Sequence, residues 1–174
     1  FVLGQMYASE NKPDSATTVF KKIVNFRKAP DKFKIHAQIA IAKNFPKDSS
    51  SVSLHKTLRK LIKNRDNRPY LDALYYQVGV LEEYKDSISL AVENYNKSLR
   101  AKNAKPTQKT YTYERLGNLY FKNNEFQLAS SYYDSVLQVA ENKTALRIRR
   151  VKRKFKNLAA LIAYEKTVKT NDSI

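Results

Sequence analysis

Few side chains in this sequence have the types and spacing that catalysis requires. The chain has two histidines, His36 and His55, and no cysteine. Neither histidine stands in a paired metal-ligand spacing. Glu82 and Glu83 are adjacent, so on a helix they point in different directions and cannot work as an acid–base pair. The glycines are scattered singly, which excludes a phosphate-binding loop. We therefore expect no catalytic, metal or cofactor site, and no enzyme.

The densest chemical feature is a basic run, RIRRVKRKFK, which places seven cations in the ten positions 147–156. Three interpretations are open: the solvated face of a helix, a docking surface for an acidic partner, or a nucleic-acid contact. No base-stacking platform, recognition helix or glycine-rich loop accompanies the charge, which disfavours nucleic acid. If the run docks a protein, the candidate residues are Arg147, Arg149, Arg150, Arg153 and Lys154.

The whole chain is basic, with 33 Lys+Arg against 16 Asp+Glu and a formal net charge of +17 over 174 residues. Such a field favours anionic partners but does not specify a fold. A hydrophobic share of 42% predicts a globular domain. No apolar stretch approaches the roughly 18 residues of a membrane span. The chain begins without Met or a signal-peptide pattern, so we expect a fragment of a longer protein.

A repeated pattern accounts for the scattered glycines. Residues 75–98 and 113–136 align when Gly79 is placed on Gly117, and the opening residues repeat the pattern around Gly4. In each copy an alanine follows the glycine after twelve positions, and an aromatic residue follows the alanine after four. These pairs are Ala16 with Phe20, Ala91 with Tyr95, and Ala129 with Tyr133. Small residues at both crossings let two antiparallel helices approach closely, so each copy predicts a helical hairpin.

A weaker copy lies between the first two, where Ala42 takes the place of the glycine. Its second helix would carry Leu54, Leu58 and Leu61. We expect repeats at about 1–30, 32–66, 70–104 and 109–140, followed by a divergent hairpin at 141–170. In that last hairpin the basic run would occupy the first helix, above an apolar stripe of Ile148, Val151, Phe155, Leu158 and Ile162.

The offsets of small and large residues resemble the tetratricopeptide repeat over about residues 1–140. The sequence thus predicts an all-α, tetratricopeptide-like α-solenoid of about five helical hairpins that forms a single domain over 1–174. Such arrays hold partners on the face lined by their first helices, for which the candidates are Tyr76, Tyr84, Asn118 and Lys122. Asn118 falls where many peptide-binding arrays carry an asparagine that bonds the ligand backbone, and Lys122 lies one turn further on.

Several phrases go beyond the generic repeat and resemble the SprE/PorW family, the periplasmic tetratricopeptide lipoproteins of gliding motility and type IX protein secretion. These phrases are residues 64–81, 94–101, 132–137 and 163–174. The resemblance implies a scaffold, anchored to the outer membrane by an acylated N-terminal cysteine outside this chain. It would couple the outer-membrane translocon to the periplasmic motor-linked ring. Two alternatives stay open: a cytosolic tetratricopeptide regulator that recognises acidic peptides or nucleic acid, and an anchor to the cell wall or to a lipid surface.

Overall fold

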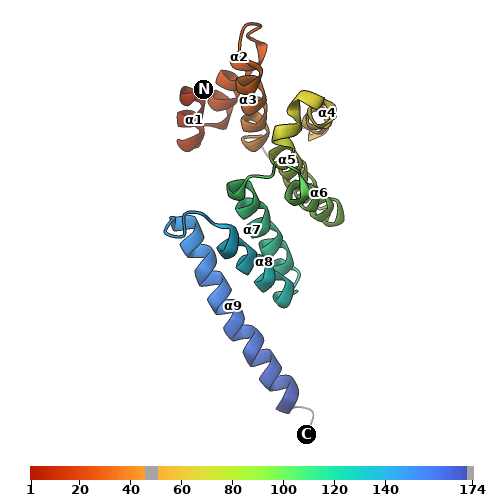
Figure 1. Ribbon diagram of the computed structural model, residues 1–174, viewed down its shortest axis with the longest axis vertical. Helices are drawn as coiled ribbons and strands as arrows, with labels where there is room; N and C mark the ends of the chain where they lie inside the picture. The colour runs from red at the N-terminus through yellow and green to blue at the C-terminus, as the bar shows by residue number, and fades with distance from the viewer. Residues whose placement is uncertain (46–50, 172–174) are drawn as a thin grey trace. The chain divides into compact units, whose positions relative to one another are not determined.

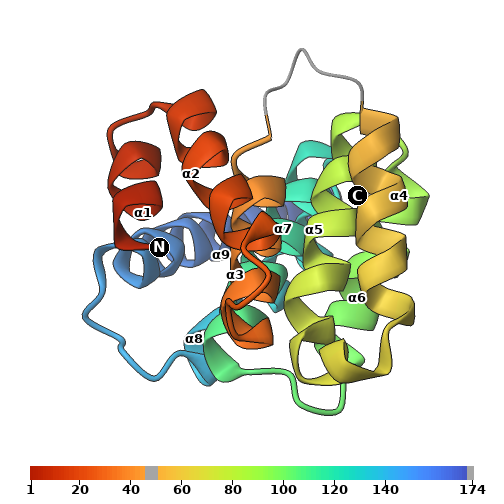
Figure 2. The same cartoon turned by 90° about the horizontal axis from the view of Figure 1, so that it is seen from above.

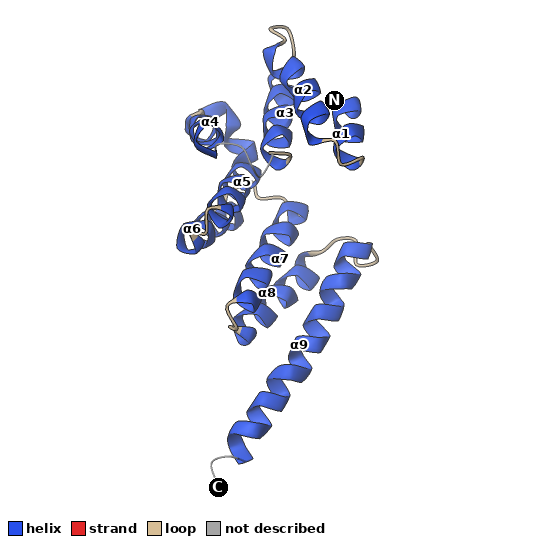
Figure 3. Cartoon of the chain, turned by 180° about the vertical axis from the view of Figure 1, so that it is seen from behind, coloured by secondary structure: helices blue, strands red, loops and turns tan. Residues whose placement is uncertain are grey.

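The computed structural model of the protein, drawn in Figure 1, describes residues 1–45 and 51–171. Every regular element in these residues is a helix, as Figure 3 shows. The all-α prediction is confirmed. Backbone contacts divide the chain into two compact units, Phe1–Asn94 and Tyr95–Ile174. Each unit is described by itself, and the expectation of a single domain over 1–174 stays a prediction.

The first unit begins with a close helical hairpin. Helices α1 (Val2–Ser9) and α2 (Pro13–Asn25) pack side by side, as Figure 2 shows. Pro13 opens α2 at a position where the missing N–H costs no helical bond. Gly4 is buried at the crossing, where an added Cβ would lie 2.7 Å from a carbon of the Phe20 ring. Only glycine permits this approach.

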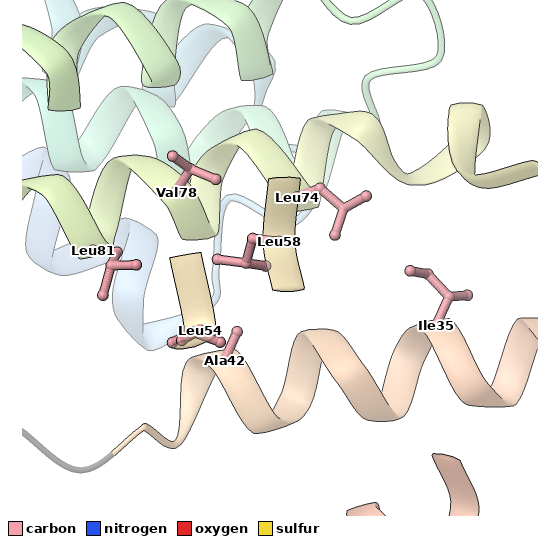
Figure 4. Packing of buried hydrophobic residues seen from close by; sticks show 7 residues of the cluster. All are labelled: Ile35, Ala42, Leu54, Leu58, Leu74, Val78 and Leu81. Carbon is pink, nitrogen blue, oxygen red and sulfur yellow. The ribbon is translucent and has the colours of Figure 1, made fainter. Parts of the chain in front are cut away.

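The remaining helices of this unit enclose a second core. They are α3 (Asp31–Lys43), α4 (Ser51–Lys63), the short 3-10 helix η1 (Arg65–Tyr70), α5 (Leu71–Tyr84) and the start of α6 (Ile88–Arg100). Side chains of α3, α4 and α5 converge in the cluster of Figure 4: Ile35, Ala42, Leu54, Leu58, Leu74, Val78 and Leu81. Ala42, Leu54 and Leu58 thus point inward as predicted. The turn between α3 and α4 lies outside the described residues.

Three hairpin turns share one backbone device. Each contains a residue with φ close to +60°, seven positions after the glycine of its repeat: Asn11, Asp86 and Asn124. In all three turns the next amide donates to the carbonyl oxygen five residues earlier, over 2.9 Å. Asn and Asp tolerate this left-handed conformation better than other residues with a Cβ. Each first helix therefore ends at the same place in the repeat.

The second unit consists of three long helices and the end of α6. These are α7 (Pro106–Lys122), α8 (Phe126–Val139) and α9 (Leu146–Asn171). At the crossing of α7 and α8, a Cβ on Gly117 would lie 2.7 Å from Cε1 of Tyr133. The core of the unit is the buried cluster of Ala129, Tyr133, Val136, Ala140, Ile148, Val151 and Leu158.

The expected hairpin at 141–170 is wrong, because residues 146–171 form one uninterrupted helix. Its C-terminal half runs on past the ends of α7 and α8 (Figure 1). Residues 157–163 contain strong helix formers and neither glycine nor proline, so nothing stops the helix. The spacing from Ala160 to Tyr164, which suggested a second helix, is also an ordinary i,i+4 step. The predicted apolar stripe does face the core.

A tyrosine stack lies beside the α7–α8 crossing. The rings of Tyr120 and Tyr132 are 5.3 Å apart between centroids and only 6° from parallel. Burial raises the pKa of the Tyr132 hydroxyl above its usual 10.0, and the neighbouring Tyr120 raises it further. A deprotonated phenolate is therefore disfavoured in the folded unit.

The first prediction concerns the glycine crossing. A methyl group at position 117 would press into the Tyr133 ring, which is buried. We expect Gly117→Ala to lower the free energy of unfolding by about 1–2 kcal/mol, because overpacking costs roughly 1–3 kcal/mol and the gain in helix propensity returns at most about 1. Urea unfolding followed by circular dichroism measures the change. In a Tyr133→Leu background the same substitution should leave the free energy of unfolding unchanged or raise it. An equal loss of stability in both backgrounds would show that the Tyr133 ring is not what excludes a side chain at position 117.

The second prediction concerns alkaline pH. Because the pKa of Tyr132 is raised in the folded state, its contribution to stability is complete below the unfolded pKa of about 10 and is lost as pH rises through the folded value. The melting temperature should therefore fall as the pH rises above about 10, and Tyr132→Phe should reduce that fall. Tyr164→Phe, at a side chain that is 69% exposed, is the control. Identical pH profiles for wild type and Tyr132→Phe would refute the assignment.

Candidate functional site

The side chain of Asn118 joins three helices of the second unit. It follows Gly117 on α7, where α8 comes close enough for the Tyr133 hydroxyl to donate to Asn118 Oδ1 over 2.9 Å. Lys154 of α9 donates to the same oxygen from Nζ over 2.8 Å. The Lys154 ammonium also lies 5.7 Å from the centroid of the Tyr133 ring, within cation–π range. An amide and a cation therefore meet at this crossing, but the cation is Lys154 and not Lys122, which was expected beside Asn118.

The asparagine borders a pocket of about 350 Å³, lined by Asn118, Phe121, Tyr133, Lys154, Asn157, Leu158 and Leu161. Its wall combines amide and ammonium donors with aromatic and aliphatic carbon. Since Asn118 Oδ1 already accepts two hydrogen bonds, the amide NH₂ is the group left to bond a ligand. An ammonium carries three donor protons, and Lys154 donates one of them to Asn118. The pocket suits a carbonyl or carboxylate group next to an apolar side chain.

Burial makes the tyrosine in this site harder to deprotonate. It raises the pKa of the Tyr133 hydroxyl above 10.0, and the negative charge of Glu114 raises it further. The hydroxyl therefore stays protonated at neutral pH and serves as the donor to Asn118. This bond holds the asparagine side chain in one orientation.

The pocket lies at one end of a row of side chains that α7 and α9 turn toward each other. Thr110, Glu114 and Asn118 follow one another at four-residue steps along α7, while Arg147, Lys154 and Leu161 follow at seven-residue steps along α9. Both spacings keep side chains on one side of a helix. Arg147 and Lys154 donate hydrogen bonds across this row to Glu114 and Asn118. Beyond them, Leu161 and Phe121 line the pocket.

Arg147, a predicted docking residue, is engaged inside the unit. Its Nη1 donates to Glu114 Oε2 over 2.5 Å and its Nη2 to Thr110 Oγ1 over 2.6 Å. The guanidinium carbon lies 3.9 Å from the centroid of the Tyr111 ring. Guanidinium geometry suits this combination of forked hydrogen bonds and stacking. Arg147 therefore ties α9 to α7.

Three other predicted cations, Arg149, Arg150 and Arg153, are exposed on α9. They form no ion pair among the described residues. Lys152 and Lys156 are exposed on the same helix. This outward cluster keeps its charge available to solvent or to an acidic partner.

The predicted groove residues fall in different units. Tyr76, half-buried, and Tyr84, exposed, are on α5 of the first unit. Asn118 and Lys122 are on α7 of the second. Lys122 is exposed at the end of that helix and does not line the pocket. A common groove formed by all four stays a prediction.

The structure brings together a pair that sequence reasoning missed. His55 Nε2 on α4 lies 2.6 Å from Glu82 Oε1 on α5, and the two side chains are only 16% and 7% exposed. No spacing rule relates residues so far apart in the chain. Within the described residues, no three His, Asp or Glu side chains are grouped as metal ligands would be. The two side chains come close where α4 packs beside α5, but the geometry gives His55 Nε2 no hydrogen bond within the described residues.

The lining residues Asn157, Leu158 and Leu161 were not predicted as site residues either. The signal that could have found them was the seven-residue spacing from Arg147 through Lys154 to Leu161, which is legible in the sequence. It was obscured by the expectation that a turn interrupts this segment.

None of the helices in the described residues is both long and apolar enough to cross a membrane.

Comparison with known proteins agrees with this geometry. The family model of the tetratricopeptide repeat matches residues 110–143, which contain most of α7 and all of α8. None of the curated proteins matches the chain. The match includes Gly117, Ala129 and Tyr133, the residues of the close crossing. Asn118 thus stands in a tetratricopeptide-repeat region of a helical solenoid, an architecture of generally non-catalytic scaffolds that bind other proteins.

Proposed function

We propose that this protein is a scaffold that holds a partner protein, and that the pocket beside Asn118 receives an extended segment of that partner. The observation that carries the proposal is the convergence of Tyr133 and Lys154 on Asn118 Oδ1. It orients an amide donor and a cation before any ligand arrives, so little entropy is lost on binding. A peptide carbonyl or an acidic side chain would bond these groups. An adjacent apolar side chain would contact Phe121 and Leu161.

The exposed cluster of Arg149, Arg150 and Arg153 supplies a second contact. Exposed charges on a rigid helix speed the encounter with an acidic surface and orient it, while adding little affinity by themselves. The cluster lies on α9, which also supplies Lys154 and three further lining residues to the pocket. One acidic partner could therefore engage both.

The finer proposal is that the scaffold belongs to the type IX secretion and gliding-motility machinery. Its support is the resemblance of residues 64–81, 94–101, 132–137 and 163–174 to the SprE/PorW lipoproteins; residues 172–174 lie outside the described part of the chain. The partners would then be components of the outer-membrane translocon and the periplasmic ring. The location would be the periplasm, at the outer membrane, through a lipid anchor outside this chain.

The third prediction tests the pocket. Lys154→Met keeps the aliphatic stem of the side chain and removes the ammonium. We expect it to weaken the partner about tenfold or more, because a hydrogen bond to a charged group contributes roughly 1.5–3 kcal/mol. The measurement is affinity purification of the parent protein from its native cell with quantitative mass spectrometry, in which secretion components should be depleted from the variant.

Lys143→Met is the matched control for the pocket, since it removes the same charge from an exposed position that neither lines the pocket nor belongs to the candidate binding residues. It should leave the recovered proteins unchanged. Equal recovery from Lys154→Met and wild type would refute the pocket. If the wild-type protein recovers nucleic-acid-linked proteins and no secretion components, the assignment to the type IX secretion machinery is refuted, whereas the pocket is not.

The fourth prediction tests the outward cluster. Reversal of Arg149, Arg150 and Arg153 to Glu should slow association with the partner at low salt and weaken its salt dependence. Surface plasmon resonance with a protein recovered in the affinity purification measures both. Reversal of Lys56, Arg59 and Lys60, exposed on α4, changes the net charge equally. If both triple variants behave alike, net charge is responsible and α9 presents only a solvated face.

A further inference from the structure

The turn between α2 and α3 exposes two aromatic rings. Phe26 directly follows α2 and is 58% exposed, and Phe33 lies in the first turn of α3 and is 42% exposed. The turn stands at one end of the α2–α3 pair in Figure 1. Other residues of the same helices, such as Phe20 and Ile35, are buried as their pattern predicts. The solenoid core therefore does not account for these two rings.

Cations surround the rings. Residues 21–34, KKIVNFRKAPDKFK, contain six Lys or Arg and a single carboxylate, Asp31. The Lys32 ammonium lies 5.2 Å from the centroid of the Phe33 ring. The other exposed cations of the segment are Lys21, Lys22, Arg27 and Lys28. Apolar rings and positive charge thus alternate along this short segment, and Lys32 and Phe33 adjoin in space.

Hydrogen bonds hold this turn in shape. The amide of Ala29 donates to the carbonyl of Phe26 over 3.0 Å, and the amide of Phe33 donates to the carbonyl of Pro30 over 2.9 Å. The Lys34 ammonium reaches back to the carbonyl of Arg27 over 3.2 Å. An ordered turn loses little conformational entropy when its rings are buried by a partner.

We infer that the α2–α3 turn is a contact site for an anionic lipid surface. Phe26 and Phe33 enter the boundary between head groups and acyl chains, and the surrounding cations pair with lipid phosphates. Apolar insertion and electrostatic attraction add in such a contact. The site is separate from the pocket and the arginine cluster of the second unit, so it stands or falls independently of the proposed scaffold function.

The observations favour lipid over the other anionic partners. The rings project from a turn, and a protein partner would have to supply a matching cavity for each of them. Single-stranded nucleic acid needs a basic groove that tracks the backbone between stacking rings, which a turn does not offer. A bilayer boundary accepts apolar side chains without shape complementarity. Its phosphates also match the sign of the charge.

The chain contains no tryptophan, which permits a direct experiment. Phe26→Trp places a reporter at the turn, and Leu146→Trp places one at an exposed position beside the arginines of α9. The probe is vesicles of phosphatidylcholine and phosphatidylglycerol with brominated acyl chains. We expect a blue shift and bromine quenching for Phe26→Trp only. Neither signal should appear with phosphatidylcholine alone.

Paired variants separate the turn from the net charge of the protein. Arg27→Glu with Lys28→Glu should reduce vesicle co-sedimentation by at least about tenfold. Arg100→Glu with Lys102→Glu, exposed at the α6–α7 turn, has the same formal charge and should bind nearly as wild type does. Phe26→Ser with Phe33→Ser should also lose at least about tenfold. Since all these side chains are exposed, melting curves are expected to stay unchanged.

The inference is overturned if Phe26→Trp shows no quenching by brominated lipid, or if the charge reversals at the two turns reduce sedimentation equally. It is also overturned if vesicles fail to bind while a single-stranded oligonucleotide shifts the Phe26→Trp emission, which would assign the turn to nucleic acid. Quenching of Leu146→Trp alone would transfer the lipid contact to α9.

Discussion

The close approach of two helices at a glycine is the constraint on which the second unit depends. Between α7 and α8 there is no room for a Cβ at Gly117, because the Tyr133 ring occupies that space. The same contact recurs between Gly4 and Phe20 in the first hairpin. A glycine inside a helix costs roughly 1 kcal/mol relative to alanine. This cost is offset by burial of a large ring that no wider crossing would cover so well.

The site follows from that crossing. Because the ring of Tyr133 lies against Gly117, its hydroxyl comes out beside the next residue of α7 and donates to Asn118. The oriented asparagine oxygen then receives Lys154 from α9. Burial raises the pKa of the Tyr133 hydroxyl, so the proton that it donates is held more firmly than in a free tyrosine. The packing of the Tyr133 ring against Gly117 thus also places the Tyr133 hydroxyl as a hydrogen-bond donor. A pocket with polar groups results next to the apolar core.

The sequence predicted those features that a local period determines. The glycine, alanine and aromatic offsets located the crossing at Gly117, and the apolar stripe of α9 was correct from Ile148 to Ile162. What depends on tertiary distance was missed. His55 and Glu82 meet only because α4 packs beside α5. The uninterrupted α9 was missed for another reason, since an i,i+4 spacing is common to every helix and cannot mark the start of a new one.

The basic run 147–156 shows why charge counted along a sequence does not equal charge on a surface. Helical periodicity turns Arg147 and Lys154 toward α7, where they bond Glu114, Thr110 and Asn118. Arg147 loses part of its hydration and pairs with Glu114 inside the unit, whereas Lys154 stays exposed beside the pocket. Arg149, Arg150 and Arg153 keep theirs. A run that reads as one polyanion site therefore has three roles: Arg147 stabilises the helix pair, Lys154 lies beside Asn118 at the pocket, and the three exposed arginines face outward.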